Sequence, residues 1–470
     1  MVFSSMVFLF AFVPVVFALY FAVPRFLKNA VLFIVSLFFY AWGEPRYILL
    51  MLTSIGAAYV TGLFADKEKY GKKTALISTV FAVVWNMGLL LFFKYSGFFV
   101  MNTNSLFHTA FKVPEIALPI GISFYSFQSL SYVIDVYRGE VKPQKNFITL
   151  GTYVALFPQL VAGPIVRYID IEKQLNAERK FSPEQFASGA KRFAVGLAKK
   201  SLLANNIYIL FDEVSHADAS QLSVGAAWLG TIAYTFQIYF DFSGYSDMAI
   251  GMGRMLGFDF LENFDYPYIS KSVTEFWRRW HMSLSSWFRD YVYIPLGGNR
   301  KGKVRQCVNI MIVWCLTGFW HGANWNFLLW GLYFGVLLLI EKLVLLKRLE
   351  KLPAVVQHIY ALFIIVIGWG IFAFEDTAQL KANFANMFGF GGLELWNDQT
   401  TLWFTEFLPL MIVLIIGSTP VVEKLRIKMN NTFPKHYQLI AEPVLTAAML
   451  VLSTAYLASS AFNPFLYFRF

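Results

Sequence analysis

The chain has 470 residues, of which 57% are apolar, 19% aromatic and only 14% charged. Roughly 270 apolar residues suffice for about ten or more bilayer spans of about 20 residues each, far more than one soluble core buries. The composition therefore excludes a soluble globular enzyme and a disordered chain, and it predicts an all-α protein that crosses a lipid bilayer many times.

Charge and cysteine content narrow the class of protein. Lys and Arg number 39 against 29 Asp and Glu, a formal net charge of +10, which is typical of cationic loops that face an anionic inner leaflet. The chain has no lysine-rich tail or basic repeat, so we expect no nucleic-acid partner. Cys307 and Cys315 form no disulfide framework, and no His or Cys spacing matches a metal site, so we expect no metal and no bound cofactor.

Twelve apolar runs are candidates for membrane spans. Several are shorter than the about 20 residues that cross a bilayer unaided, and such segments can be re-entrant where protein buries their backbone. We therefore expect ten to twelve spans in one domain over residues 1–470. The runs are residues 2–23, 27–42, 47–64, 75–93, 148–166, 193–211, 224–240, 308–320, 326–340, 359–374, 402–416 and 443–457.

Polar segments between the runs set the expected orientation. Residues 24–29 and 65–74 carry most of the early Lys and Arg side chains, which places both segments in the cytoplasm and the N-terminus outside. The longest polar interval, residues 167–200, contains Ser182 followed by Pro183 and Glu184, which favours the start of an amphipathic helix there.

Acidic residues in apolar surroundings are costly in lipid and need a reason. Asp241 and Asp247 follow the run that ends at residue 240 and are expected to interrupt it, and Asp135 stands in a second apolar segment. Broken helices with carboxylates occur in ion-coupled transporters, which keeps a proton-coupled transporter open as an alternative. As structural ion-pair partners the acids would meet basic side chains such as Arg278, Arg279 and Arg289.

Residues 275–291 predict one amphipathic helix. Glu275 and Arg279 stand four residues apart and are expected to pair. An interfacial helix with a tryptophan belt fits the same pattern, so a purely structural role for His281 stays open. The apolar stripe consists of Trp277, Trp280, Leu284 and Trp287, and the adjacent polar stripe consists of Arg278, His281, Ser285 and Arg289.

A cationic loop follows this segment. The chain runs through Gly297 and Gly298 into Arg300 and Lys301. Such a loop suits the phosphates of a substrate and the headgroups of the inner leaflet equally well, and both interpretations remain open.

His321 stands at the junction of two apolar runs, between Gly318 and Gly322. The two glycines allow other backbone or a ligand to approach closely. An imidazole has a pKa of about 6.5, so it is mostly neutral at pH 7 and is able to take a proton from a hydroxyl, as acyl transfer to an alcohol requires. A packed histidine bonded to a neighbouring carbonyl is the structural alternative.

Four motifs resemble the membrane-bound O-acyltransferase (MBOAT) family, in the branch of the alginate (AlgI) and peptidoglycan (PatA) O-acetyltransferases. They are residues 119–125, 157–165, 275–298 and 319–322, and the resemblance covers essentially the whole chain. It implies a ring of about 10–12 transmembrane helices with re-entrant segments around a central tunnel.

The resemblance also implies a site and its substrates. His321 matches the family's active-site histidine, and His281 matches the second histidine of this branch. Cytoplasmic acetyl-CoA would be the acyl donor, and an extracytoplasmic acetyltransferase- or esterase-like partner protein would pass the acetyl group to a polysaccharide. The location would be the inner (cytoplasmic) membrane of a bacterium. Candidate substrate-binding residues beside the histidines are Trp277, Arg278, Arg289, Asp290, Trp320 and Asn324.

A related branch of the family offers an alternative function. The DltB branch moves D-alanine from a carrier protein toward teichoic acid, and it shares histidine motifs of this type. The alternative from another class is the proton-coupled transporter, which predicts repeated halves with matching broken helices. The sequence shows no such repeat.

Overall fold

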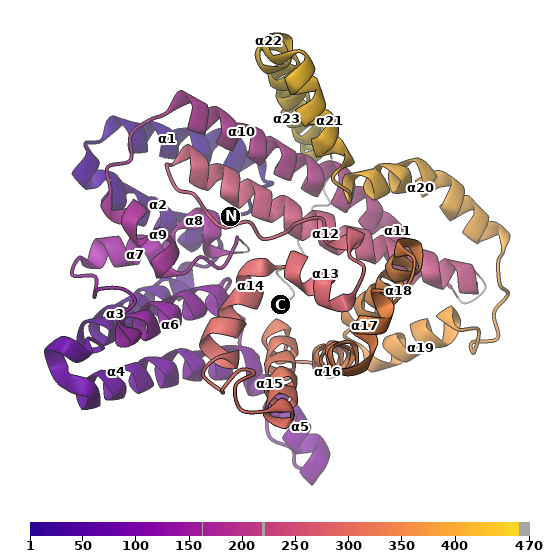
Figure 1. Ribbon diagram of the computed structural model, residues 1–470, viewed down its shortest axis with the longest axis horizontal. Coiled ribbons are helices and arrows are strands. Elements are labelled where there is room, and N and C mark those ends of the chain that lie inside the picture. The colour runs from indigo at the N-terminus through magenta and orange to yellow at the C-terminus, as the bar shows by residue number, and fades with distance from the viewer. Residues whose placement is uncertain (162, 219–220, 460–470) are drawn as a thin grey trace. The chain divides into compact units, whose positions relative to one another are not determined.

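The computed structural model describes residues 1–161, 163–218 and 221–459. Over these ranges the chain forms helices, turns and no strand, so the predicted all-α class is confirmed (Figure 1). The chain divides into two compact units, residues 1–193 with 245–261 and residues 194–244 with 262–470. Helices α10 (Pro183–Ala198) and α12 (Val224–Met255) contribute residues to both units. The single domain over residues 1–470 stays a prediction, as does the ring around a tunnel.

The first unit holds the N-terminal helices, and polar side chains start several of them. Asp66 accepts hydrogen bonds from the backbone N–H groups of Glu68 and Lys69 (3.0 and 3.2 Å) and so caps α4. Although α4 begins at Lys67, its backbone is not helical at Gly71 (φ 78°, ψ 161°), so the 65–74 segment contains a short helical turn and then a kink. The helices of this unit are α1 (Val13–Ala22), α2 (Lys28–Gly43), α3 (Ile48–Phe64), α4 (Lys67–Leu90), α5 (Ser96–Phe107), α6 (Ile122–Arg138), α7 (Phe147–Ala155), α8 (Phe157–Leu160) and α9 (Tyr168–Asn176), with π-helical or 3-10 turns η1 (Phe8–Phe12), η2 (Arg25–Leu27), η3 (Pro45–Tyr47) and η4 (Leu91–Tyr95).

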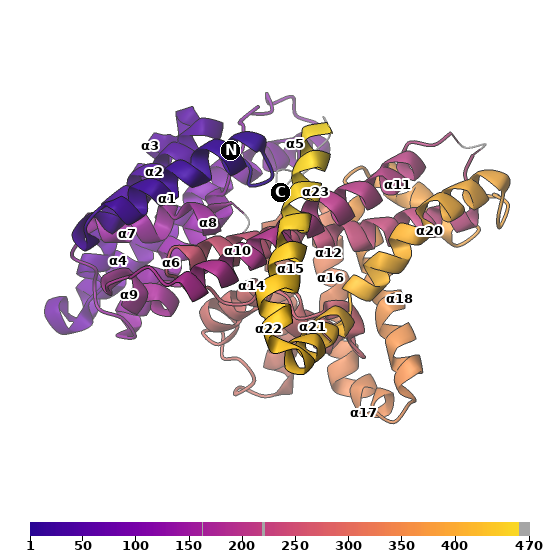
Figure 2. The same ribbon diagram turned by 90° about the horizontal axis from the view of Figure 1, so that it is seen from above.

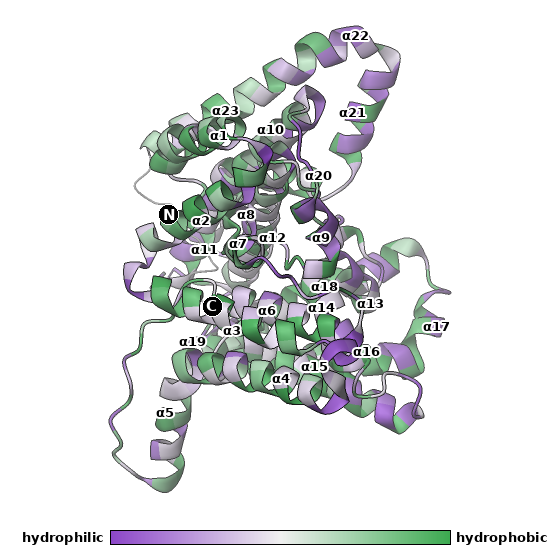
Figure 3. Cartoon of the chain, turned by 90° about the vertical axis from the view of Figure 1, so that its left-hand side faces the viewer, coloured by the Kyte–Doolittle hydropathy of each residue, from purple (hydrophilic) through white to green (hydrophobic). Residues whose placement is uncertain are grey.

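The second unit holds both candidate histidines. Its helices are α11 (Asn205–Ser215), α13 (Val273–Arg279), α14 (Met282–Phe288), α15 (Lys303–His321), α16 (Trp325–Ile340), α17 (Leu346–Leu349), α18 (Ala354–Ala373), α19 (Thr377–Met387), α20 (Asp398–Gly417), α21 (Val421–Thr432), α22 (Pro434–His436) and α23 (Glu442–Ser459), with the short turns η5 (Lys199–Ala204), η6 (Pro267–Ile269), η7 (Arg289–Tyr293), η8 (Glu341–Leu345) and η9 (Tyr437–Ala441). Among these, α21 and α22 carry many hydrophilic residues, whereas α23 is mostly hydrophobic (Figure 3).

Seven helical segments of the described chain are long and apolar enough to cross a membrane, which indicates a multi-pass membrane protein. This number is smaller than the ten to twelve spans expected, because several predicted runs form shorter or more polar helices. The run at residues 2–23, for example, gives the short apolar helix Phe8–Ala22. The seven segments are Arg25–Gly43, Pro45–Phe64, Lys67–Phe107, Trp325–Leu349, Ala354–Ala373, Asp398–Gly417 and Pro434–Ser459.

Two regions of the middle sequence differ from the prediction in opposite ways. The run at residues 148–166 forms no single helix, because Leu156 leaves the helical conformation (φ −52°, ψ 110°) between α7 and α8. The acidic segment, by contrast, does not break its helix: α12 continues through Asp241 and Asp247 to Met255. The broken helix that the transporter alternative required at this position is therefore absent from α12.

Asp241 and Asp247 are ion-paired as expected, but with basic partners other than the predicted Arg278, Arg279 and Arg289. Within the second unit, Asp241 Oδ1 lies 2.7 Å from Lys200 Nζ, and both side chains are almost fully buried. Within the first unit, Asp247 Oδ1 lies 2.6 Å from Arg192 Nη2. These ion pairs offset the cost of burying the charges, so both carboxylates are tolerated inside α12.

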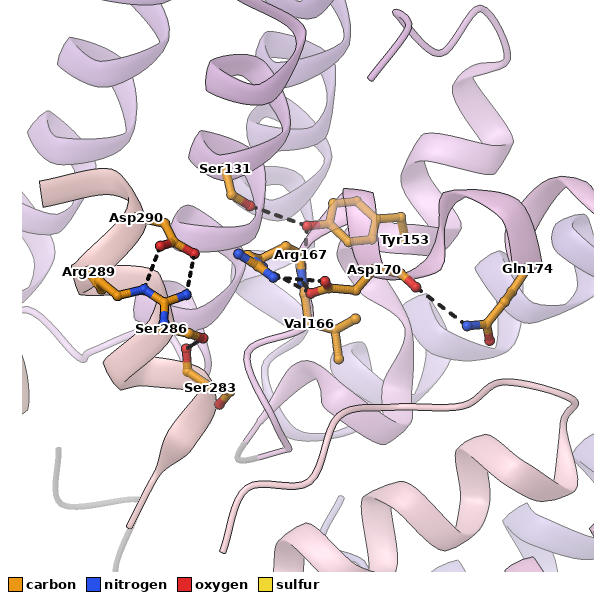
Figure 4. A network of polar contacts seen from close by, with 10 residues as sticks. All are labelled: Ser131, Tyr153, Val166, Arg167, Asp170, Gln174, Ser283, Ser286, Arg289 and Asp290. Carbon is orange, nitrogen blue, oxygen red and sulfur yellow. Dashed lines mark hydrogen bonds and ion pairs between the residues drawn. The ribbon is translucent and has the colours of Figure 1, made fainter. Parts of the chain in front are cut away.

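The segment after α8 in the first unit is held by its own polar network (Figure 4). Arg167 and Asp170 form two side-chain hydrogen bonds (3.0 and 2.9 Å) and cap the start of α9. The buried hydroxyl of Tyr153 donates to the backbone carbonyl of Val166 at 3.1 Å.

The predicted helix start at Ser182 and Pro183 is confirmed. Helix α10 begins at Pro183, and the backbone N–H of Gln185 donates to Ser182 Oγ (3.2 Å).

In the second unit, α16 and α18 form a hairpin whose connection contains η8 and α17 (Figure 2). Helix α15 packs against α16 at a crossing of two glycines, because a Cβ at Gly318 would lie 3.1 Å from the Cα of Gly331. The close crossing brings the end of α15, where His321 stands, against the first turns of α16. Another face of α15 carries an apolar groove of about 460 Å³, lined by Cys307, Val308, Met311, Ile312, Cys315 and Leu316.

Candidate active site

His321 is the last residue of α15, and its side chain is 9% exposed. Two aromatic rings meet the imidazole nearly perpendicularly: Trp330 at 5.1 Å and 84°, and Phe372 at 5.3 Å and 83° between ring centroids and planes. Gly322 is extended (φ −168°, ψ 155°), so the chain leaves the helix immediately after the histidine. The imidazole therefore sits at a helix end between aromatic walls contributed by α16 and α18.

The glycines beside His321 do what the sequence predicted. A Cβ at Gly322 would overlap the ring of Phe327, and a Cβ at Gly318 would overlap the backbone carbonyl of the same residue. Both positions are thus in direct contact with the first turn of α16. The prediction of close approach is confirmed, and the group that approaches is the backbone and side chain of Phe327.

An aromatic cluster extends from His321 toward α13. Trp277 of α13 packs edge-on against Trp330 (5.4 Å) and Phe334 (4.9 Å) of α16 and against Trp314 of α15 (4.7 Å). The His321 ring contacts this cluster through Trp330. Trp277, a candidate substrate-binding residue, thereby forms part of the wall that joins the two histidine segments.

The helix predicted over residues 275–291 is wrong at its centre. Helix α13 ends at Arg279, Trp280 is extended (φ −105°, ψ 129°), and His281 is left-handed (φ 45°, ψ 52°) before α14 begins at Met282. The periodic stripes do not detect this break, because each half is helical with the expected spacing. The predicted pair of Glu275 and Arg279 is confirmed at 3.0 Å.

The break is held by Asn263, a residue outside the set predicted from the sequence. Its backbone carbonyl accepts from the N–H of Met282 (3.0 Å). Its side-chain Oδ1 accepts from the N–H (3.2 Å) and the hydroxyl (2.9 Å) of Ser283. On the other side of His281, the N–H of Asp265 donates to the carbonyl of Arg279 (3.0 Å). The backbone on both sides of His281 is therefore paired with residues 263–265.

These contacts also define the state of His281. Its Nδ1 lies 3.1 Å from Asn263 Oδ1. Because Ser283 identifies that atom as the oxygen by donating its own N–H, Nδ1 of the imidazole carries the proton and Nε2 carries the lone pair. Burial lowers the pKa of His281 to about 3, so the ring is neutral at pH 7.

Trp320 is the side chain that both histidines share. Its ring lies 5.0 Å from that of His321 and 6.4 Å from that of His281, and it is 6% exposed. His281 is 2% exposed and meets Phe242 of α12 edge-on at 4.7 Å. Two imidazoles 40 residues apart in the sequence are thus brought to one buried indole.

The remaining candidate binding residues lie in different surroundings. Asn324 caps α16, accepting from the N–H of Trp325 (2.6 Å) and donating to the carbonyl of Glu375 (3.1 Å). Arg278 is exposed, and Arg289 and Asp290 pair with each other through two hydrogen bonds of 2.7 and 3.1 Å (Figure 4). Contact of any of these residues with a substrate stays a prediction.

The cationic loop after η7 is exposed at Arg300 and Lys301. Gly297 and Gly298 have positive φ angles (109° and 54°), which a tight turn requires there. Asn309 of α15 donates to the carbonyl of Gly298 (3.0 Å) and fixes the loop to the helix. The binding of phosphates by this loop stays a prediction. Over the described ranges, no cluster of three or more His, Cys, Asp or Glu side chains is arranged to hold a metal ion.

Comparison with known proteins gives consistent similarities. Residues 143–373 match the model of the membrane-bound O-acyltransferase (MBOAT) family, a range that contains both histidines. Over the full length of both chains, the sequence is 38% identical to a probable alginate O-acetylase AlgI of Azotobacter vinelandii. It is 32% identical to a peptidoglycan O-acetyltransferase of Helicobacter pylori, covering 84% of this chain and 81% of that one.

A more distant similarity concerns the alternative branch. A teichoic acid D-alanyltransferase of Bacillus subtilis is 30% identical over 47% of this chain and 58% of its own. The O-acetylases are thus similar over more of the chain and at a higher identity than the D-alanyltransferase.

Proposed function

Because the chain belongs to the membrane-bound O-acyltransferase family and is an O-acyltransferase of its alginate and peptidoglycan O-acetyltransferase branch, we propose that it transfers acetyl groups from acetyl-CoA to a hydroxyl through His321 and His281. The observation that carries the proposal is the contact of both buried imidazoles with the ring of Trp320. A buried aromatic site with one imidazole placed to take a proton and a second, neutral imidazole placed to orient a hydroxyl suits a reaction that moves a proton as an ester forms.

The proposed reaction needs one base at the attacking hydroxyl. The acceptor oxygen attacks the thioester carbonyl carbon while His321 takes the hydroxyl proton. The carbon–sulfur bond then breaks, CoA leaves as the thiolate, and the proton on His321 is returned to that sulfur. The products are an O-acetyl ester and CoA. The aromatic walls formed by Trp330 and Phe372 exclude water from the thioester, which limits hydrolysis.

His281 has a supporting role in this proposal. Its Nδ1–H is directed at Asn263 Oδ1, so the Nε2 lone pair is the side that faces away from this bond. A neutral ring of fixed tautomer is suited to orient a hydroxyl by accepting its hydrogen bond. It does not supply positive charge to the site, because burial lowers its pKa to about 3.

The wider setting is part of the same proposal. The acetyl-CoA comes from the cytoplasm, and Arg300 and Lys301 attract its phosphates at the exposed loop. The acceptor is a polysaccharide outside the inner membrane of a bacterium, reached through an extracytoplasmic acetyltransferase- or esterase-like partner protein. The support for a polysaccharide acceptor is the similarity to the alginate O-acetylases and the peptidoglycan O-acetyltransferase.

The test is release of free CoA from acetyl-CoA by the purified protein in detergent or nanodiscs, with a soluble oligosaccharide as acceptor. We expect turnover by the wild type and by His216→Ala, a matched variant at an exposed histidine. We expect none above background from His321→Ala. Equal turnover by His321→Ala and wild type would remove His321 from the reaction. Transfer from a D-alanyl carrier protein, with none from acetyl-CoA, would assign the chain to the D-alanyl function instead.

A further inference from the structure

Glu341 is a buried carboxylate at the far end of α16, with an exposed fraction of 0%. Its Oε1 accepts from the N–H of Val273 (2.7 Å) and the hydroxyl of Tyr360 (3.1 Å). Its Oε2 accepts from the N–H (2.8 Å) and the hydroxyl (2.6 Å) of Thr274. Both oxygens are therefore occupied as acceptors, and two of the four donors are the first backbone N–H groups of α13.

The position of this carboxylate links it to both histidines. Helix α16 begins four residues after His321, and Trp330 in its second turn contacts the His321 ring. Phe334, one turn further, contacts Trp277 of α13. Glu341 then follows the last residue of α16 and holds the start of α13. Helix α16 thus contacts His321 through Trp330 near its start, and it contacts α13 through Phe334 in its middle. Glu341, directly after its end, also contacts α13.

Helix α13 has seven residues and leads directly to the turn at His281. The N–H of Trp280 donates to the carbonyl of Phe276 (2.9 Å), and its ring packs against Trp369 of α18 at 4.7 Å. A short helix with a fixed start and a packed end transmits a displacement of its first residue to its last. The left-handed conformation of His281 depends on the same alignment, since its neighbours must still pair with Asn263.

We propose that Glu341 is a positioning residue for the acyl-transfer site: its carboxylate fixes the start of α13 against α16 and thereby orients His281 relative to His321. This inference rests on the proposed function for its catalytic consequence. The anchoring itself is a structural statement and has its own test. A carboxylate fits these contacts because each of its oxygens faces one backbone N–H, whereas the NH2 of a side-chain amide would face one of these two N–H groups whichever way it turned.

The anchoring is tested by hydrogen–deuterium exchange of the peptide that covers residues 270–285. In Glu341→Gln we expect the amides of Val273 and Thr274 to exchange roughly tenfold faster than in the wild type. Glu350→Gln changes an exposed glutamate nearby and serves as the matched control with wild-type exchange. Unchanged exchange in Glu341→Gln would overturn the proposal.

The positioning role is tested by the kinetics of CoA release. We expect kcat to fall about 10- to 100-fold in Glu341→Gln, with the KM for acetyl-CoA within about twofold of the wild type. Tyr360→Phe removes one donor and leaves the carboxylate, so we expect a loss below about fivefold. In a His281→Ala background, Glu341→Gln should lower kcat by less than a further factor of about two, because Glu341 acts through the imidazole that this background lacks.

Two results would contradict the positioning role: wild-type kcat in Glu341→Gln, or a loss that multiplies fully with that of His281→Ala. If Glu341→Gln does not yield folded protein, Thr274→Val, which deletes one donor to the carboxylate, enters the same comparisons with an expected loss of about three- to tenfold. A wild type that transfers D-alanyl groups from a carrier protein and releases no CoA from acetyl-CoA would refute the proposed donor, and the exchange measurement would then decide on the anchoring by Glu341 alone.

Discussion

The backbone at His281 is left-handed and paired on both sides with residues 263–265, whereas His321 ends a regular helix between aromatic rings. A non-glycine residue in the left-handed region costs about 1 kcal/mol or more and persists only where its surroundings over-determine it. Asn263 provides that constraint at His281. At His321, the rings of Trp330 and Phe372 pack edge-on against the imidazole.

Under the proposed function, this difference assigns different roles to the two imidazoles. The imidazole of His281 is fixed in tautomer and orientation, which suits a group that orients another molecule. The imidazole of His321 lies where two helices cross and where the chain turns, next to glycines that leave no room for other side chains. We therefore assign the larger share of the reaction to His321, and the following predictions test this assignment from the largest effect to the smallest.

The first prediction compares the two histidines directly. We expect His321→Ala to lower the rate of CoA release by about 10³-fold or more, because the base is lost, and His281→Ala to lower it by about 10- to 100-fold. The rates are measured per amount of folded protein, with folding checked by the thermal midpoint. A larger loss from His281→Ala than from His321→Ala would reverse the assignment.

The second prediction separates packing from chemistry at His321. In Gly318→Ala the new Cβ overlaps the carbonyl of Phe327, so α15 and α16 must move apart. We expect the free energy of unfolding to fall by about 3 kcal/mol, together with a loss of activity. Gly56→Ala is the matched control, because a Cβ there has open space. Wild-type stability of Gly318→Ala, measured by thermal unfolding, would show that the helix crossing is not tight.

The third prediction concerns the constraint at His281. Asn263→Ala removes the acceptor of three hydrogen bonds, two from Ser283 and one from His281. We expect a loss of about 2 kcal/mol in the free energy of unfolding, since buried donors are left without a partner. Asn431→Ala, at an exposed position, is the control and should leave the stability unchanged. Equal stability of both variants would mean that other contacts hold the left-handed turn.

The fourth prediction uses pH. Burial lowers the pKa of His281 to about 3, below its value of about 6.5 in the unfolded chain. Between these values the unfolded chain binds the proton and the folded chain does not, so stability falls as the pH drops from 6.5 toward 3. At pH 5.5 we expect this loss to be about 1.4 kcal/mol in the wild type. It should be absent in His281→Asn, where asparagine tolerates the left-handed backbone. Parallel thermal midpoints of the two proteins from pH 7.5 to 5.5 would contradict it.

The sequence predicted properties that depend on composition and on local pattern. The membrane class and the helical class follow from apolar content. The close approach beside His321 follows from Gly318 and Gly322, and the pair of Glu275 and Arg279 follows from helical spacing. Each of these is decided within one or two turns of helix, where periodicity and residue size are sufficient.

The parts that sequence reasoning missed depend on contacts between distant segments. The break at His281 is made by Asn263, 18 residues away, and no periodic pattern reports on it. Lys200 was not recognised as the partner of Asp241 because it lies in another helix. The signal that did exist was the asparagine itself, a buried polar residue within an aromatic segment at Asn263-Phe264, which needs partners wherever it lies.

The two cysteines of α15 offer a practical consequence. Cys307 and Cys315 are eight residues apart on the groove face, about 12 Å along the axis, which is beyond the about 7 Å that a disulfide spans. Neither thiol can crosslink the other, so both remain as attachment points for thiol-reactive fluorophores or spin labels. Burial raises the pKa of Cys315, so that thiol labels more slowly near neutral pH. With Cys307→Ser, a single native probe stands six residues before His321 and reports from inside the unit that carries both histidines.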